Sequence, residues 1–135
     1  MNAAATGDGL PSALAKTLLV VEDNVLVRHA VADALRGAGY TVLDASTAEE
    51  AKAVLTAVPV DLVFTDLNIP TEGEGFSVAQ FARECCPGMP LIFTSGRVAA
   101  PMRARLKEFG PFLPKPYLIS KLVEIIGEKL SDKTE

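Results

Sequence analysis

Asp61-Leu62-Val63-Phe64-Thr65-Asp66 is the stretch of sequence that decides the fold. Its centre, Leu62-Val63-Phe64, is apolar without interruption, which is typical of a strand that is buried on both faces of a parallel sheet. Three other runs end in polar residues in the same way: Leu18-Leu19-Val20-Val21 before Glu22-Asp23, Leu91-Ile92-Phe93-Thr94 before Ser95-Gly96, and Phe112-Leu113-Pro114 before Lys115-Pro116. The pattern predicts several parallel strands whose carboxyl ends all carry reactive side chains.

Helical patterns separate these runs, so strands and helices alternate along the chain. We predict strands over residues 17–21, 41–45, 61–66, 90–95 and 112–114. The predicted helices run from a cap at Asp23 or Asn24 to a stop at Gly39, from a Thr47 cap to residue 57, and over 76–86, 101–109 and 118–130. The first helix is expected to bury Val27, Ala30, Val31, Ala34, Leu35 and Ala38, and the last Leu118, Leu122, Ile125 and Ile126.

This alternation predicts an α/β protein with a flavodoxin-like, doubly wound, five-stranded parallel sheet of order 2-1-3-4-5. Right-handed crossovers place helices on both faces of such a sheet. We expect one folded domain over residues 17–130, a flexible leader over 1–16 and a polar tail over 131–135.

Composition excludes several classes of function. The chain has 135 residues and a net charge of −4, and its Lys and Arg residues are scattered, which disfavours nucleic-acid binding. It has neither an apolar stretch of about 20 residues nor the features of a secretory signal, so we expect no membrane contact and a cytoplasmic location. Cys85 and Cys86 are expected to be reduced thiols, and the single histidine, His29, a surface residue.

The polar residues at the strand ends point to a cation and a phosphoryl group. Glu22, Asp23 and Asp66 follow two strands that neighbour each other in the predicted sheet. Three carboxylates held together repel one another unless a cation or protons neutralise them, and Mg²⁺ prefers such oxygen ligands. Ser95 offers a hydroxyl, Gly96 leaves room for a close approach, and Lys115 offers an ammonium between two prolines.

Four motifs in this order closely resemble response-regulator receiver domains of two-component signalling. They are Val20-Val21-Glu22-Asp23-Asn24, Thr65-Asp66-Leu67-Asn68-Ile69-Pro70, Thr94-Ser95-Gly96 and Leu113-Pro114-Lys115-Pro116. The resemblance covers about residues 16–130. It implies a phosphoacceptor signalling domain that catalyses only its own phosphorylation and dephosphorylation.

The resemblance also assigns roles to the residues of the motifs. Asp66 would take a phosphoryl group from a phosphohistidine on a histidine kinase or a phosphotransfer protein. Mg²⁺ would be held by Asp23 and Asp66, together with Glu22 and the backbone carbonyl of Asn68. Because phosphoryl transfer depends on positioning and charge stabilisation, such a set needs no separate general base.

The remaining roles concern the response to the phosphoryl group. Ser95, Gly96 and Lys115 would contact it, and Phe112 stands where the family has its switch aromatic. The domain would signal to a downstream protein and could form a homodimer through its fourth helix, fifth strand and fifth helix. Residues 97–111 depart most from the family pattern, and the stretch between Ser95 and Lys115 is about two residues shorter than usual. The loop over 71–75 looks one residue longer than usual.

Three alternatives remain. The same residues could form the receiver segment of a hybrid histidine kinase, although the initial Met and polar tail favour a single-domain regulator. A phosphatase of the haloacid-dehalogenase type would need a second Asp where this chain has Asn68. An FMN-binding flavodoxin would have its phosphate repelled by Glu22 and Asp23.

Overall fold

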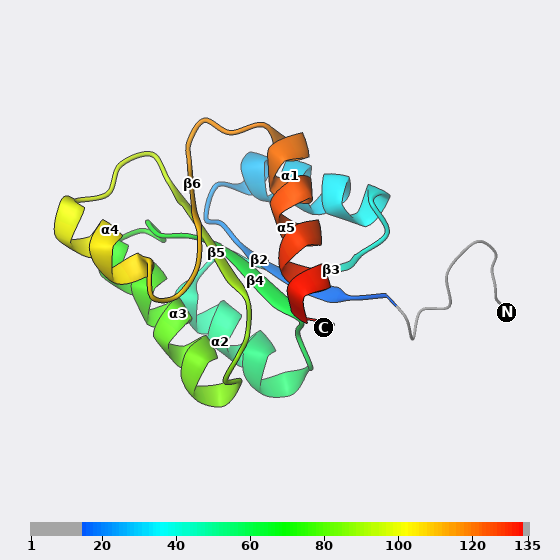
Figure 1. Cartoon of the computed structure of the whole chain (residues 1–135), viewed down its shortest axis with the longest axis horizontal. Coiled ribbons are helices and arrows are strands. Elements are labelled where there is room, and N and C mark those ends of the chain that lie inside the picture. Colours follow the sequence, from blue (N-terminus) through cyan, green and yellow to red (C-terminus); the bar gives the residue numbers. More distant parts are fainter. Residues whose placement is uncertain (1–14, 134–135) are drawn as a thin grey trace, which may run out of the picture.

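The predicted strands and helices are all present in the computed structural model, which describes residues 15–133 (Figure 1). The strands are β2 Thr17–Val21, β3 Thr41–Ala45, β4 Leu62–Asp66, β5 Leu91–Ser95 and β6 Phe112–Pro114. The helices are α1 Val25–Gly37, α2 Ala48–Ala57, α3 Glu72–Cys85, α4 Ala100–Leu106 and α5 Ile119–Lys133. Residues 1–14 of the predicted leader lie outside the described residues. No helix within 15–133 has the length and hydropathy that crossing a membrane requires.

All neighbouring strands are parallel, in the order β3-β2-β4-β5-β6. In chain order this is the predicted 2-1-3-4-5 arrangement, so the fold prediction is confirmed. β4 lies at the centre and every one of its five residues is buried. β3 lies at an edge and is less buried, with Thr41 exposed and Asp44 half-buried.

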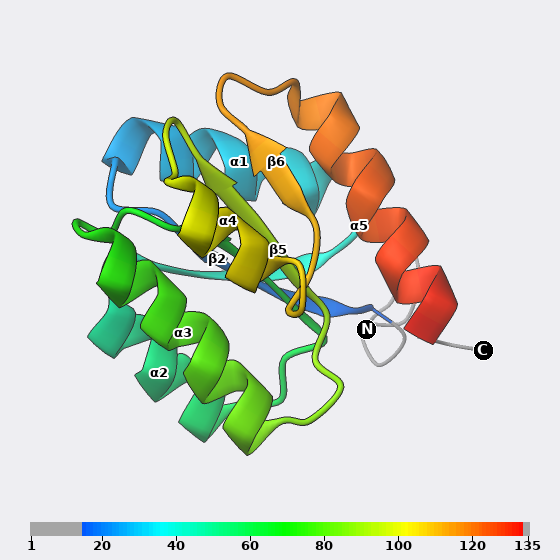
Figure 2. The same cartoon turned by 60° about the vertical axis from the view of Figure 1, so that its left-hand side comes forward.

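Helices cover both faces of the sheet (Figures 1 and 2). Successive strand residues point to opposite faces. Leu18 and Val20 therefore belong to the core under α1 and α5, whereas Leu19 and Val21 belong to the core under α2, α3 and α4. The two cores fix the strands from both sides, and the loops after the strands meet at one edge.

Side-chain caps set where the helices begin. The Asn24 side chain accepts from the Val27 amide, which selects Asn24 over Asp23 as the cap of α1. α3 begins at Glu72, four residues before the predicted start, because Thr71 caps it and accepts from the Glu74 amide. Residues 72–75 were therefore wrongly predicted as a loop.

Several helix details differ from the prediction. Ala30 and Ala38 are exposed and Ala32 is buried instead, so the buried face of α1 is centred on Val31, Ala32 and Leu35. Leu118 precedes α5 and is 72% exposed. α4 ends at Leu106 rather than Phe109, and α5 continues beyond Leu130 to Lys133.

Candidate functional site

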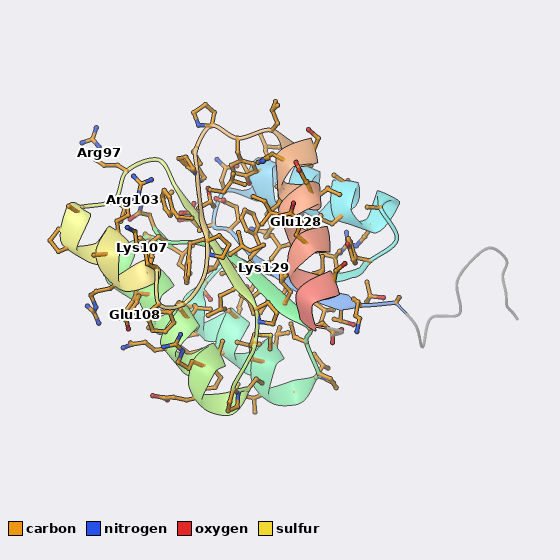
Figure 3. The ribbon with its side chains drawn as sticks, in the orientation of Figure 1. Arg97, Arg103, Lys107, Glu108, Glu128 and Lys129 are labelled. Carbon is orange, nitrogen blue, oxygen red and sulfur yellow. The ribbon has the colours of Figure 1, made fainter. Side chains whose placement is uncertain are left out.

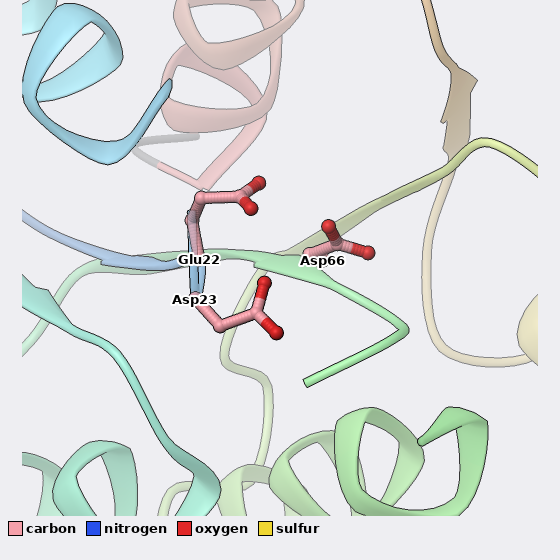
Figure 4. A group of neighbouring side chains, drawn as sticks. All are labelled: Glu22, Asp23 and Asp66. Carbon is pink, nitrogen blue, oxygen red and sulfur yellow. The ribbon is translucent and has the colours of Figure 1, made fainter. Parts of the chain in front are cut away.

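Three carboxylates meet at the carboxyl edge of the sheet. Glu22 directly follows β2 and Asp66 is the last residue of β4, and these strands pair with Val21 opposite Thr65. One oxygen from each of Glu22, Asp23 and Asp66 lies within 4.8 Å of the others (Figure 4). Glu22 and Asp66 are each only 4% exposed, whereas Asp23 is exposed. The sequence prediction that these carboxylates lie together is confirmed by this geometry.

Lys115 reaches this cluster from the loop after β6. Its Nζ lies 2.7 Å from Oδ2 of Asp66 and 3.3 Å from Oε1 of Glu22. Its backbone amide donates to the Ser95 carbonyl at 3.0 Å, which holds the lysine beside β5. Burial acts to lower the pKa of Lys115, but the hydrogen bonds and charges of Asp66 and Glu22 outweigh burial and raise it. The ammonium therefore remains charged and partly neutralises the cluster.

Glu22 is held in place through both its side chain and its backbone. Its Oε2 accepts from the Asn24 amide at 3.1 Å, and its carbonyl accepts from the Arg28 guanidinium at 3.0 Å. Burial raises the pKa of Glu22, and the nearby negative charge of Asp66 raises it further, although Asn24 and Lys115 oppose the shift. Because the charged form of Glu22 is disfavoured here, a cation beside it would stabilise that form.

Arg28 and Tyr117 belong to the surroundings of the site, and the sequence motifs did not reveal either. The Tyr117 ring packs edge-on against Phe64 at 5.8 Å. Its hydroxyl oxygen is buried with no hydrogen-bond partner among the described residues. Burial and the charge of Glu22 raise the pKa of Tyr117 to about 12. The tyrosine thus forms a neutral, apolar wall beside the carboxylates.

The Ser95 hydroxyl lies at the end of β5 and is fully engaged. Its Oγ accepts from the Asn68 amide nitrogen at 2.7 Å and from the Arg97 backbone amide at 3.1 Å. It also donates to the Arg97 carbonyl at 2.8 Å. The Asn68 backbone amide in turn donates to Oδ1 of Asp66 at 2.9 Å. Asn68 therefore links Asp66 to Ser95, a role for its side chain that the sequence did not indicate.

Phe112 shares a cavity with Ser95. This cavity of about 230 Å³ is lined by Ser95, Gly96, Arg97, Val98, Arg103, Phe112 and Pro114. Phe112 is half-buried on β6, and the Arg103 guanidinium lies 4.8 Å from its ring centroid. Ser95 and the predicted switch aromatic therefore line the same cavity.

The donor set fits a hard divalent cation. All three clustered side chains offer carboxylate oxygens, the ligand type that Mg²⁺ prefers, and the exposed Asp23 leaves the cluster open to solvent. The group could therefore hold a metal ion. Asn68, whose backbone carbonyl was predicted as a further ligand, is half-buried two residues beyond Asp66.

His29 and the cysteines take no part in this site. His29 is exposed on α1, as predicted. Cys85 and Cys86 are free thiols at the end of α3, and their Sγ atoms lie 3.2 Å apart. Burial and the neighbouring thiol raise the pKa of Cys85 to about 11, so this thiol is protonated at neutral pH.

Comparison with known proteins gives consistent results. Residues 18–127 match the model of the response regulator receiver domain family. A CheY-like receiver domain protein from Methanospirillum hungatei JF-1 has a structure with a TM-score of 0.83 and 27% identity, covering 89% of this chain and 97% of that one. The transcriptional regulator NtrC of Rhizobium meliloti is 30% identical over 118 residues, covering 86% of this chain.

Sensor kinase CckA of Brucella abortus is 34% identical over 119 residues, covering 84% of this chain. The chain spans only 24% of the NtrC sequence and 12% of the CckA sequence. The similarity therefore concerns one domain of these larger relatives.

Proposed function

The chain belongs to the response regulator receiver domain family of two-component signalling, and on this premise we propose that Asp66 accepts a phosphoryl group from a phosphohistidine. The donor is a histidine kinase or a histidine phosphotransfer protein. The observation that carries the proposal is that the Asp66 carboxylate contacts the Lys115 ammonium at 2.7 Å and lies beside the carboxylates of Glu22 and Asp23.

The Asp66 carboxylate is the nucleophile. One of its oxygens forms a bond to phosphorus while the phosphorus–nitrogen bond breaks, and the imidazole leaves with the electron pair of that bond. Lys115 neutralises charge on the carboxylate and on the transferred oxygens, and the Asn68 amide orients Oδ1. Asp23 and Asp66, with Glu22 and the Asn68 carbonyl, would hold Mg²⁺, which supplies further positive charge beside the phosphoryl oxygens.

The response begins at Ser95. Its hydroxyl leaves the Arg97 carbonyl and donates to a phosphoryl oxygen, while Gly96 allows the close approach. Phe112 then turns into the cavity that it shares with Ser95. The support for this step is that Ser95 and Phe112 line the same cavity and that Phe112 is only half-buried.

The wider context is also part of the proposal. We place the domain in the cytoplasm, where it acts on a downstream protein rather than on nucleic acid or a membrane. The same proposal includes assembly into a homodimer through α4, β6 and α5. Relatives include both a transcriptional regulator and a sensor kinase. A single-domain regulator and the receiver segment of a hybrid kinase therefore both fit the site.

The test is phosphorylation by acetyl phosphate in the presence of Mg²⁺. The wild type should gain the mass of one phosphoryl group and Asp66→Asn should gain none. Asp33→Asn, a change to an exposed carboxylate on α1, should behave as the wild type. Unchanged labelling of Asp66→Asn, or no labelling of the wild type by acetyl phosphate or by any phosphorylated kinase, would contradict the proposal.

A further inference from the structure

Two adjacent thiols lie side by side where α3 ends. Cys85 is the last residue of α3 and Cys86 follows it as the cap, and their Sγ atoms are 3.2 Å apart. Cys85 is exposed, whereas Cys86 is half-buried and packs against the core under α2, α3 and α4. The full chain contains no other cysteine. The two residues, which we call the dithiol, therefore form a solvent-accessible pair that the proposed function does not use.

The dithiol lies far from the carboxylate cluster. α3 begins at the Thr71 cap, in the loop after β4, and its last residue leads through a short turn to the start of β5 (Figure 2). The helix has 14 residues and is therefore about 21 Å long. A ligand on the dithiol would leave Asp66 and its neighbours free.

No cation activates the dithiol. Arg83 is two residues away in sequence, but its guanidinium donates to the carbonyl of Glu108, which follows α4, and lies 3.8 Å from the Phe109 ring centroid (Figure 3). Burial and the neighbouring thiol raise the pKa of Cys85 to about 11. Peroxides react with the thiolate rather than the thiol, so the pair is poorly suited to sensing them.

A disulfide and a zinc site both fit the dithiol poorly. Neighbouring residues joined by a trans peptide have Cα atoms about 3.8 Å apart, below the usual disulfide range of about 4.4–6.8 Å. Zinc in structural sites takes about four ligands, with Zn–S bonds of about 2.3 Å that place two sulfurs about 3.8 Å apart. Within residues 15–133, neither cysteine belongs to a group of three His, Cys, Asp or Glu side chains that could hold a metal ion.

We propose that Cys85 and Cys86 together bind a trivalent arsenical that carries one organic group. Trivalent arsenic is thiophilic and pyramidal, and its bonds stand close to right angles. If its bonds to sulfur are about as long as those of zinc, about 2.3 Å, a right angle separates the two sulfurs by about 3.3 Å. The observed separation is 3.2 Å. One organic group leaves two replaceable oxygens on arsenic, which matches the two thiols of the chain.

Binding is a condensation without a change of oxidation state. The dihydroxy form of the arsenical loses both hydroxyl groups: each Sγ forms a bond to arsenic while one arsenic–oxygen bond breaks, and the thiol proton leaves with that oxygen as water. Arsenic remains trivalent, two water molecules are released and no oxidant is consumed. The second bond closes a ring within one chain, so a free monothiol competes poorly with the pair.

The test uses phenylarsine oxide and the reduced full chain. Intact-mass spectrometry should show one phenylarsenic unit per chain with two hydrogens lost, retained in excess 2-mercaptoethanol and removed by 1,2-ethanedithiol. The matched control is the double variant Cys85→Ser/Ser120→Cys, which keeps two thiols but separates them, since Ser120 is exposed on α5. It should bind about 100-fold more weakly and lose the adduct to 2-mercaptoethanol.

A second measurement shows whether the folded chain holds the site. Phenylarsine oxide should raise the thermal unfolding midpoint of the wild type, because the native state keeps both side chains in place for binding. The double variant should unfold cooperatively and show no such rise. A lowered midpoint of the wild type would place binding in the unfolded chain and contradict the proposal.

The remaining outcomes are equally decisive. Absence of an adduct, loss of the wild-type adduct to 2-mercaptoethanol, equal retention by the double variant, or stronger binding of Zn²⁺ or arsenous acid would each overturn the proposal. Acetyl phosphate labelling should be unchanged in the arsenical-loaded protein because the dithiol lies far from Asp66. Failure of the dithiol is therefore distinguishable from failure of Asp66 as acceptor.

Discussion

The amide nitrogen of Asn68 donates a hydrogen bond of 2.7 Å to the Ser95 hydroxyl, joining the loop after β4 to the end of β5. Asn68 also touches Asp66, because its backbone amide donates to Oδ1 at 2.9 Å. One residue therefore contacts both the proposed acceptor and the proposed sensor. Whatever draws Ser95 toward Asp66 must first compete with this bond.

Removing the Asn68 side chain should make the response easier. In Asn68→Ala the Ser95 hydroxyl loses one partner, and a neutral hydrogen bond contributes about 0.5–1.5 kcal/mol. We expect half-maximal response to beryllofluoride, measured by NMR chemical shifts, at a concentration lower by about two- to tenfold. In a Ser95→Ala background the same change should have little effect, as a double-mutant cycle requires. An equal gain in both backgrounds would show that Asn68 acts by another route.

Replacing Lys115 should affect both stability and phosphorylation. Lys115→Met keeps an apolar stem but leaves Asp66 and Glu22 without their ammonium. Urea unfolding without Mg²⁺ should show a loss of about 1–3 kcal/mol, and labelling by acetyl phosphate should slow by about 100-fold. Adding Asp66→Asn should restore part of the lost stability because it removes a repelling charge. Lys121→Met, at an exposed pair on α5, should change neither property.

Mg²⁺ should stabilise the protein through the carboxylate cluster. At about a hundred times its dissociation constant, a ligand of the native state adds about 2.7 kcal/mol. Asp23→Asn should lose most of this Mg²⁺-dependent stabilisation in thermal unfolding, whereas Asp33→Asn should keep it. An Asp23→Asn protein that responds to Mg²⁺ like the wild type would exclude Asp23 as a ligand.

Replacing two glycines of α3 by alanine should change the stability of the fold in opposite directions. A Cβ at Gly75 would lie 1.9 Å from the Leu67 carbonyl oxygen, whereas a Cβ at Gly73 would meet nothing within 4 Å. Gly75→Ala should therefore destabilise the fold by about 1–3 kcal/mol or more, since backbone must shift. Gly73→Ala should stabilise it by up to about 1 kcal/mol. Urea denaturation measures both, and a stabilising Gly75→Ala would contradict the close packing of α3 on the loop after β4.

The hydrogen bonds from Ser46 to Glu50 at the start of α2 should stabilise the fold less in acid than at neutral pH. Hydrogen bonds from the Ser46 amide and hydroxyl lower the pKa of Glu50 below its ordinary value of 4.5. A carboxyl group whose pKa is lower in the folded state stabilises the fold at higher pH and loses that contribution as pH falls through the folded value. Wild-type stability should consequently fall more between neutral pH and pH 3 than that of Glu50→Gln. Equal pH profiles of unfolding would show that the bond adds nothing.

The sheet could be predicted from sequence because the residue pattern of each strand reflects its burial. Leu62, Val63 and Phe64 are apolar without interruption, which matches a central strand covered on both sides. The polar residues that end the strands, such as Asp66, then follow at one edge. Strand order and the clustering of Glu22, Asp23 and Asp66 result from this simple geometry.

The start of α3 and the partner of Ser95 could not be predicted in the same way. Gly73 and Gly75 are typical of a loop, and the reason for a glycine at position 75 is its contact with Leu67, which only the folded chain reveals. The bond from Asn68 to Ser95 depends on the rotamer of one side chain and on the distance between two loops. Neither quantity is present in a pattern of residue types.

The complete burial of β4 also determines how the molecule opens. Amides of a central strand that is covered on both faces are expected to exchange with solvent only when the whole domain unfolds. α4 is a helix of seven residues without a side-chain cap, so it is expected to open locally and far more often. Asp66 thus belongs to the strand that is expected to exchange most slowly, whereas Arg103 belongs to a helix that is expected to exchange much faster. Under the proposed function, phosphorylation at the end of a strand that rarely opens would be read out in a helix that is expected to open easily.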